Sequence, residues 1–366
     1  MHRTSFSLPR RIGTTCVVLA ALVFAGCSGP PPRSAADVRA EIARRMPAGV
    51  ADRKGWANDL YAAFATQKIE PGASNLCSAI AVIEQESGFR ADPPVPGLPR
   101  IARAEIDRRA AALHVPRFVV DAALRIDAPD GRSYAEHLAA VRTEQQLSEV
   151  FEQMISAVPM GQRLLGGLNP VHTAGPMQVS IAFAQAHARG YPYPMEGSIR
   201  HEVFSRRGGL YFGVRHLLGY RAPYTDPLYR FADFNAGWYA SRNAAFQSAA
   251  SRVAHMSLAL DGDLLRPGAA RDVPGATERV VRALRPRLAL DDAAIHRALA
   301  LGESPDFETT DLYREVFALA DAAAHARVPR ALLPEIALHS PKITRRLTTA
   351  WFARRARERW TRCMRR

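Results

Sequence analysis

The stretch IEQESGF (83–89) closes a segment whose apolar residues recur at helical spacing, at Leu76, Ile80 and Ile83. This spacing places the three side chains on one face, so the sequence predicts an amphipathic helix that ends at the E-S-G triplet. Glu86 then lies on the last turn. The helix dipole disfavours an ionised carboxylate there and favours a carboxyl that keeps its proton.

The same three- and four-residue spacing returns along most of the chain. It is found in LYAAFA (60–65), VVDAALRI (119–126), EVFEQMISAV (149–158) and VVRALRPRLAL (280–290). Segments with the strict alternation of a strand are scarce. The sequence therefore predicts a mainly α fold. The residues of segment 206–220 expected in its core are Leu210, Val214, Leu217 and Leu218.

Proline- and glycine-rich breaks suggest how the chain is divided. The break RPGAARDVPG (266–275) separates a first lobe, residues 41–262, from a C-terminal helical region, residues 263–366. The last stretch, from residue 342 onward, carries ten basic residues and one acid. We expect either a solvated helix face or a surface attracted to anionic glycan and lipid headgroups.

An export signal is predicted at the N-terminus. Residues 1–12 carry three arginines and no acid, and the apolar run CVVLAALVFA (16–25) follows. Ten apolar residues span roughly 15 Å as a helix, against a hydrocarbon core of about 30 Å. The run is therefore too short for a stable transmembrane anchor, and residues 1–26 are expected to be a cleaved signal peptide.

The end of this signal, VFAGC, resembles the lipobox of bacterial lipoproteins, with Phe24 where leucine is usual. The resemblance implies that Cys27 is acylated and that residues 27–40 form a lipidated tether. Two acyl chains already give stable anchoring. Ser28 after the cysteine favours the outer membrane, facing the periplasm. An ordinary secretory signal and an uncleaved anchor are the alternatives.

The composition is that of a globular protein. With 48% hydrophobic and 23% charged residues, it excludes wholesale disorder and a low-complexity scaffold. The net charge of +14 favours polyanionic surroundings. The export signal points to the cell envelope, so we expect no nucleic-acid partner. The sequence has no C-x-x-C, H-E-x-x-H or G-x-G-x-x-G motif, so neither a metal nor another cofactor is predicted.

Two cysteines remain beyond the signal and the lipidation site, Cys77 and Cys363. An exported compartment permits a disulfide between them. A buried free Cys77 is the alternative, because spacing in the sequence says nothing about proximity.

Two further stretches combine small residues with a polar side chain. TAGPMQV (173–179) is typical of a tight turn, in which Gln178 offers both a hydrogen-bond donor and an acceptor. FADFNAG (231–237) is typical of a helix end, with Asn235 just before a C-terminal glycine. Taken singly, a turn and a helix cap explain both stretches.

In this order, the E-S, G-P-M-Q and F-N-A-G stretches resemble those of the soluble lytic transglycosylases, relatives of goose-type lysozyme, which show E-S, G-L-M-Q and A-x-Y-N-A-G. The similarity covers about 75–90 and 170–250, and it implies a lysozyme-like helical domain over residues 41–262. It also implies that Glu86 is the single catalytic acid and base. The substrate-binding residues it implies are Ser87, Met177, Gln178, Asn235 and Tyr239.

Three departures from the family pattern stand out. The first two motifs usually lie close together, so residues from about 95 to 165 form a helical insertion. Pro176 replaces a leucine, which a turn tolerates. Phe234 replaces a tyrosine and removes a hydroxyl near the site, for which Tyr239 or Tyr211 could substitute.

The resemblance implies cleavage of the MurNAc-GlcNAc bond of peptidoglycan, with formation of 1,6-anhydro-MurNAc ends. A hydrolase needs two carboxyls, whereas one suffices when the sugar supplies its own nucleophile. The expected partners are glycan strands, the membrane and wall-remodelling proteins. The alternatives are a hydrolytic muramidase on the same fold, a glycan-binding pseudoenzyme or adaptor, and a structural lipoprotein.

Overall fold

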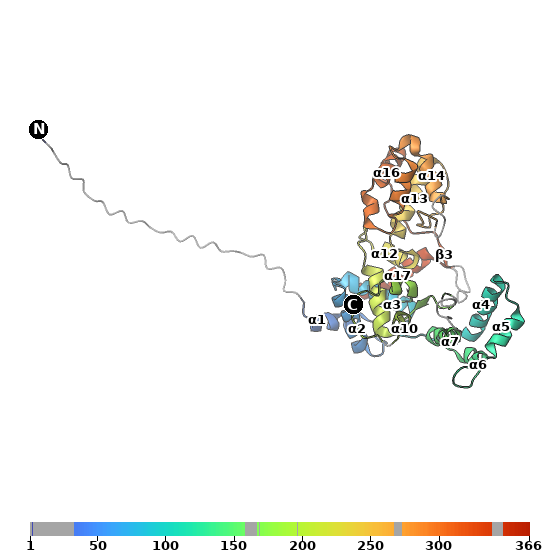
Figure 1. Ribbon diagram of the computed structural model, residues 1–366. Helices are drawn as coiled ribbons and strands as arrows, with labels where there is room; N and C mark the ends of the chain where they lie inside the picture. Colours follow the sequence, from blue (N-terminus) through green and yellow to red (C-terminus); the bar gives the residue numbers. More distant parts are fainter. Residues whose placement is uncertain are drawn as a thin grey trace. The chain divides into compact units, whose positions relative to one another are not determined.

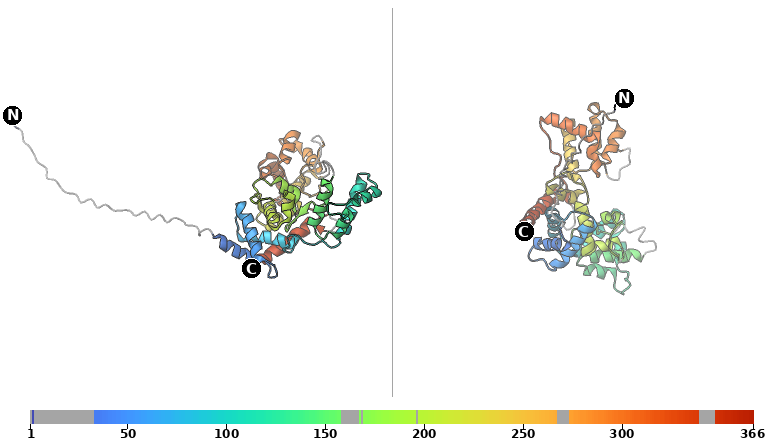
Figure 2. Two further views of the ribbon diagram at one scale, coloured as in Figure 1. Left: turned by 60° about the horizontal axis from the view of Figure 1, so that its bottom comes forward. Right: turned by 90° about the vertical axis from the view of Figure 1, so that its left-hand side faces the viewer.

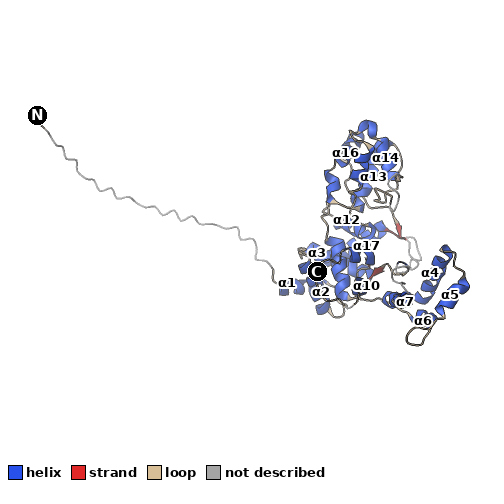
Figure 3. Cartoon of the chain, in the orientation of Figure 1, coloured by secondary structure: helices blue, strands red, loops and turns tan. Residues whose placement is uncertain are grey.

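The computed structural model describes residues 2, 33–157, 167, 169–195, 197–266, 273–338 and 347–366. These residues form sixteen α-helices, two 3-10 helices and two two-stranded hairpins, which confirms the mainly α prediction (Figures 1 and 3). Cys27 and nearly all of the predicted signal lie outside the described residues. Within those ranges, none of the helices has the length and apolar character needed to cross a bilayer.

Six helices enclose the first hydrophobic core, called core 1 here. They are α1 (Ala35–Arg45), α2 (Arg53–Thr66), α3 (Ala73–Glu86), α11 (Arg206–Leu218), α12 (Pro227–Ala236) and α17 (Thr349–Met364). Every residue of α3 from Leu76 to Ile83 is buried. The four α11 residues expected in the core are buried as well, which confirms that prediction.

Core 2 is formed mainly by the stretch expected to be an insertion and by the segment that follows it. Its elements are α4 (Leu98–Ala112), α5 (Arg117–Leu124), α6 (Tyr134–Ala140), α7 (Glu144–Ser156), β1 (Thr173–Ala174), β2 (Val179–Ser180), α9 (Ile181–Ala186) and α10 (Ile199–Phe204). Capping boxes fix where α6 and α7 begin, since Ser133 pairs with Glu136 and Thr143 with Gln146.

Core 3 lies among the helices that follow α12. They are α13 (Ala240–Ala254), α14 (Ala276–Ala283), η2 (Arg285–Arg287), α15 (Asp292–Leu299), η3 (Pro305–Thr309) and α16 (Asp311–Ala324). After α16, strand β3 (Ala337–Leu338) pairs antiparallel with β4 (Leu347–Thr348), just before α17. The chain thus leaves core 1 after α12 and returns to it through this hairpin.

The last helix does not stay with the C-terminal region to which the sequence analysis assigned it. α17 packs against α3 and α12, and both views of Figure 2 place it beside the first helices of the chain. A disulfide joins Cys77 of α3 to Cys363 of α17. The indole Nε1 of Trp360 also donates to the carbonyl of Ser74 (3.1 Å). The basic tail is therefore a structural part of core 1.

Candidate active site

The end of α3 sets the position of the candidate catalytic carboxyl. Glu86 is the last residue of the helix and is partly exposed. Both the backbone N–H and the Oγ of Ser87 donate to the carbonyl of Ile83 (3.1 Å each). Gly88 then takes a positive φ of 58°, a common helix stop. Ser87 therefore terminates the helix with its hydroxyl turned back onto it, rather than presenting it to a ligand.

The second stretch forms the hairpin of β1 and β2, with Thr173 opposite Ser180. The backbone N–H of Gln178 closes the turn on the carbonyl of Gly175 (3.0 Å). Gly175 has a φ of +74°, and a Cβ there would lie 2.1 Å from the carbonyl oxygen of Val203, so only glycine fits. The glycine of the G-P-M-Q stretch is thus required by the packing of the hairpin against Val203.

Gln178 is partly exposed, in contrast to the buried residues just before it. Its Nε2 donates to the carbonyl of Gly175 (3.3 Å), and its Oε1 accepts from the Oγ1 of Thr173 (3.1 Å). These contacts hold the amide in one orientation. One amide hydrogen and one acceptor lone pair remain for a ligand.

Met177 does not form the cleft wall that the sequence analysis expected. Its side chain is fully buried in core 1. It packs so closely on α11 that a Cβ at Gly213 would lie 2.4 Å from its Sδ. Met177 therefore fixes the hairpin to α11, which contacts α3 in turn.

The third stretch ends α12. Asn235 is exposed, and its Oδ1 accepts from the Oγ1 of Thr349 at the start of α17 (2.7 Å). Phe234 lies in core 1, where its ring stacks on Phe352 (6.4 Å between centroids) and contacts His216 (4.9 Å). An apolar ring suits this site.

Tyr239 is not placed where a substrate could contact it. Its side chain is 1% exposed, and the guanidinium of Arg242 lies 4.1 Å above its ring. Tyr211 is buried too, and its hydroxyl donates to the carbonyl of Gly190 (3.2 Å). Neither tyrosine supplies the hydroxyl that Phe234 lacks. The expectation that Tyr239 binds substrate and the expectation that Tyr239 or Tyr211 replaces this hydroxyl are therefore both wrong.

Glu84, the other carboxyl near the end of α3, has a structural role. Its Oε1 accepts from the Nη2 of Arg362 (2.9 Å) and lies 3.7 Å from the Nε of Arg359, both on α17. The tail's positive charge is partly balanced in this way. Glu84 therefore links α3 to α17.

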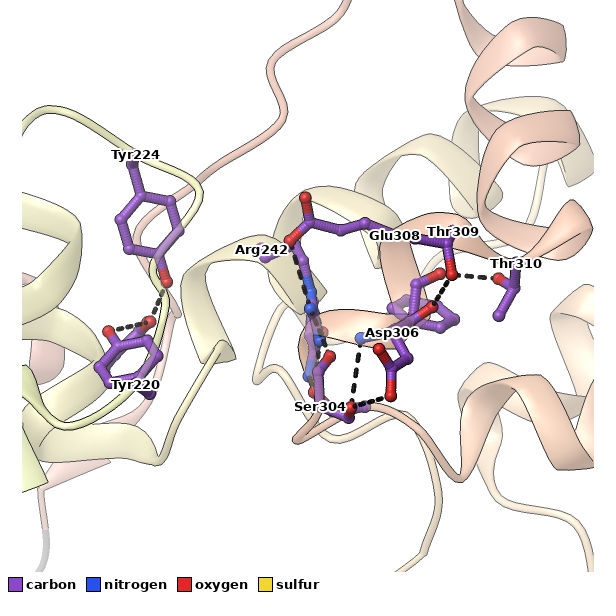
Figure 4. Close-up of polar contacts among 12 residues, drawn as sticks. Tyr220, Tyr224, Arg242, Ser304, Asp306, Glu308, Thr309 and Thr310 are labelled. Carbon is purple, nitrogen blue, oxygen red and sulfur yellow. Dashed lines mark hydrogen bonds and ion pairs between the residues drawn. The ribbon is translucent and has the colours of Figure 1, made fainter.

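A buried carboxyl that the sequence analysis did not assign to the site lies beside the F-N-A-G stretch. Asp233 accepts hydrogen bonds from the hydroxyls of Tyr220 (2.8 Å) and Tyr224 and from the backbone N–H of Ser241 (2.7 Å; Figure 4 shows the two tyrosines). Burial raises the pKa of Asp233 to about 7, although these hydrogen bonds act in the opposite direction. Its side chain points into the interior, so it is not a second carboxyl for the reaction.

This raised pKa predicts a pH-dependent stability. Between about pH 4 and pH 7 the folded state keeps a proton on Asp233 that the unfolded state has released. The free energy of unfolding should therefore fall as the pH rises through this window, by on the order of 4 kcal/mol. Asp233→Asn should remove this contribution. Denaturant unfolding of both proteins at about pH 4 and about pH 8 measures it, and an equal pH dependence in the two would contradict the assignment.

The part of the chain that the structure describes contains no group of three or more His, Cys, Asp or Glu side chains that could hold a metal ion. Among the predicted site residues, those that are at least partly exposed are Glu86, with its carboxyl, and Gln178 and Asn235, with their amides.

These observations define a mainly helical protein in which an E-S helix end, a G-P-M-Q hairpin and an F-N-A-G helix end surround one core. The chain belongs to the family described as "Protein of unknown function (DUF1615)", whose model matches residues 49–366. It is similar to "Uncharacterized protein YaiW" of Escherichia coli strain K12, with 54% identity over 353 residues, 95% of this chain and 96% of the relative. No solved structure matches it.

Proposed function

We propose that this protein is a lipid-anchored lytic transglycosylase of the cell envelope, which cleaves the MurNAc-GlcNAc bond of peptidoglycan. One observation carries the proposal. Ile83, Met177 and Phe234, which lie within or next to the three motif stretches, all belong to core 1. α3 contacts α11, and α11 contacts both β2 and α12. Stretches far apart in the sequence thus each contribute a residue to one core, which supports the proposal.

In the proposed reaction, protonated Glu86 donates its proton to the glycosidic oxygen as the bond from that oxygen to C1 of MurNAc breaks. The ionised carboxylate then removes the proton of the MurNAc 6-hydroxyl. That oxygen bonds to C1 and closes the 1,6-anhydro ring, and Glu86 regains its proton without consuming water. Gln178 and Asn235 are the accessible polar side chains that would orient the sugars.

A second candidate is a peptidoglycan-binding protein without catalysis, acting as an adaptor for wall-remodelling proteins. The observation that favours it is the apolar setting of Phe234, because neither Tyr239 nor Tyr211 restores the hydroxyl of the lytic transglycosylase motif. Digestion of purified sacculi, followed by mass analysis of the soluble muropeptides, separates the two candidates. The transglycosylase releases 1,6-anhydro ends, lighter by one water than reducing ends, whereas the binding protein releases nothing.

The proposed location at the outer membrane, facing the periplasm, rests on acylation of Cys27. The wild-type protein should incorporate labelled palmitate and fractionate with the outer membrane, because two or more acyl chains anchor stably. Cys27→Ala should remove both the label and the membrane association. A wild-type protein that stays unlabelled and soluble would refute the anchor.

A further inference from the structure

A hollow of about 450 Å³ lies between the start of α12 and the beginning of α16. One wall is formed by residues 223–226 and Tyr229. The other is formed by Glu308 of η3, Tyr313 of α16 and residues 327, 330 and 331 that follow this helix. Its volume is in the range of small-ligand sites, which are concave and carry a few well-placed polar groups. Glu86 is not among its lining residues.

Three tyrosines line the hollow, and two of them also contact side chains of the protein interior. The hydroxyl of Tyr224 donates to buried Asp233 (Figure 4 shows Tyr224), and the ring of Tyr313 packs against Phe317 with centroids 4.7 Å apart. The third ring, Tyr229, lies 5.4 Å from that of Tyr224. The hydroxyls of Tyr229 and Tyr313 form no hydrogen bond within the described ranges. The hollow therefore offers apolar ring surfaces together with two unused hydroxyls.

Within the described residues, all but one of the charged side chains that line the hollow form an ion pair. Three of the four are paired: Asp226 with Arg357 (3.1 Å), Glu308 with Arg242 (3.4 Å; Figure 4), and Arg330 with Asp321 (2.7 Å). Arg327 is exposed and makes no ion pair with any residue that the structure describes. A ligand that fills the hollow would therefore be matched best by a single negative charge.

We propose that this hollow binds a saccharide unit bearing one carboxylate. Sugar rings combine apolar C–H faces with a polar edge, which suits tyrosine rings and their hydroxyls. A guanidinium binds a carboxylate through charge-assisted, bidentate hydrogen bonds, and this is the group that Arg327 offers. The identity of the ligand rests on the proposed function, since N-acetylmuramic acid is the carboxylate-bearing sugar of peptidoglycan.

The position of the hollow fits an extended glycan. Tyr229 lies in the first turn of α12 and Asn235 at the end of the same helix. Six residues of helix span about 9 Å. Along the helix axis this is within the length of a few sugars, and the six positions also turn the two side chains about 240° around the helix, so a strand that contacts both would have to wind around α12. The hollow would hold a part of the strand away from the reacting bond.

The test is a titration with two disaccharides, made on the chain with Cys27→Ala, which the proposed anchor leaves soluble and which is the wild type of this comparison. GlcNAc-MurNAc carries the lactyl carboxylate and contains no MurNAc-GlcNAc linkage to cleave, so binding is measured without turnover. N,N′-Diacetylchitobiose, which has the same two rings and lacks the lactyl group, is the uncharged control. Arg327→Gln removes the proposed contact. Arg354→Gln, at an exposed α17 arginine that makes no ion pair with a described residue, is the matched control.

The wild type should bind GlcNAc-MurNAc about tenfold more tightly than N,N′-diacetylchitobiose, a preference expected of one charge-assisted contact. Arg327→Gln should abolish the preference, and Arg354→Gln should keep it. Tyr229→Ala should weaken binding of both sugars, with the thermal transition confirming that the variant is folded. Wild type without the preference, or Arg327→Gln that retains it, overturns the inference.

These outcomes are separable from those of the proposed function. Release of anhydro-muropeptides without a disaccharide preference overturns the hollow as a binding site and leaves the reaction standing. A preference that Arg327→Gln abolishes, without release of products, supports the hollow and refutes the transglycosylase.

Discussion

Glu86→Gln should reduce the release of muropeptides from sacculi by about 10³-fold, because glutamine cannot donate and recover a proton. The change keeps the size of the side chain and its ability to form hydrogen bonds. Glu86 is partly exposed at the end of α3, so the thermal transition of the variant should match that of the wild type. Product release from equal amounts of folded protein is the measurement.

Glu84→Gln is the matched control on the same helix. It removes one carboxylate from the contacts with Arg362 and Arg359, an ion pair near the surface that contributes at most about 1 kcal/mol. Its activity should stay within about twofold of the wild type, since the carboxylate of Glu84 faces α17. Loss of activity in Glu84→Gln, with activity kept in Glu86→Gln, would reverse the assignment.

Arg242→Met should lower the free energy of unfolding by about 3 to 5 kcal/mol. The guanidinium is fully buried between the rings of Tyr239 (4.1 Å) and Phe307 (5.2 Å). It also donates to the carbonyls of Gly302 (2.5 Å) and Ser304 (2.8 Å; Figure 4). Methionine preserves much of the volume, but it removes one donor from each carbonyl and takes the Nε and Nη2 donors away from the Oδ1 of buried Asn243 (3.1 and 3.0 Å).

Arg252→Met provides the control for this change, because Arg252 lies exposed on the same helix, α13. Its free energy of unfolding should change by no more than about 0.5 kcal/mol. Denaturant unfolding of both variants gives the comparison. Equal stability of Arg242→Met and the wild type would show that the buried guanidinium is replaceable by apolar packing.

The features that could be predicted from the sequence are those that local patterns encode. The apolar spacing of Leu76, Ile80 and Ile83 predicts α3, and the E-S-G triplet predicts where it ends. Gly175 and Gly237 mark a turn and a helix end because both require a positive φ. These signals suffice to place Glu86 on the last turn of a helix.

The sequence did not settle which aromatic and sulfur-containing side chains would be exposed. Met177 and Tyr239 were expected to contact substrate, yet both are buried. Whether such a residue faces solvent depends on partners from other parts of the chain, here Gly213 of α11 for Met177 and the ring of Tyr220 for Tyr239 (5.0 Å between centroids). No local periodicity encodes these contacts.

The buried polar groups of the fold were missed for a related reason. Charged residues are expected at the surface unless they are paired, and the partners of Asp233 and Arg242 are spread over several elements. The pairing of Cys77 with Cys363, separated by 286 positions, likewise depends on the return of α17 to core 1. Neither the hydrogen bonds of Tyr220 and Tyr224 to Asp233 nor the burial of Arg242 can be predicted from the spacing of residues in the sequence.

The central claim is that the sugar's own 6-hydroxyl, not water, replaces the leaving group. Digestion of purified sacculi in water enriched in oxygen-18 tests this most directly, because the attacking oxygen stays on C1 of the product. Our account predicts that the wild type releases muropeptides with 1,6-anhydro ends that contain no added oxygen-18. Glu86→Gln should release the same products in far smaller amounts. Products with reducing ends labelled by oxygen-18 would contradict it and identify a hydrolase.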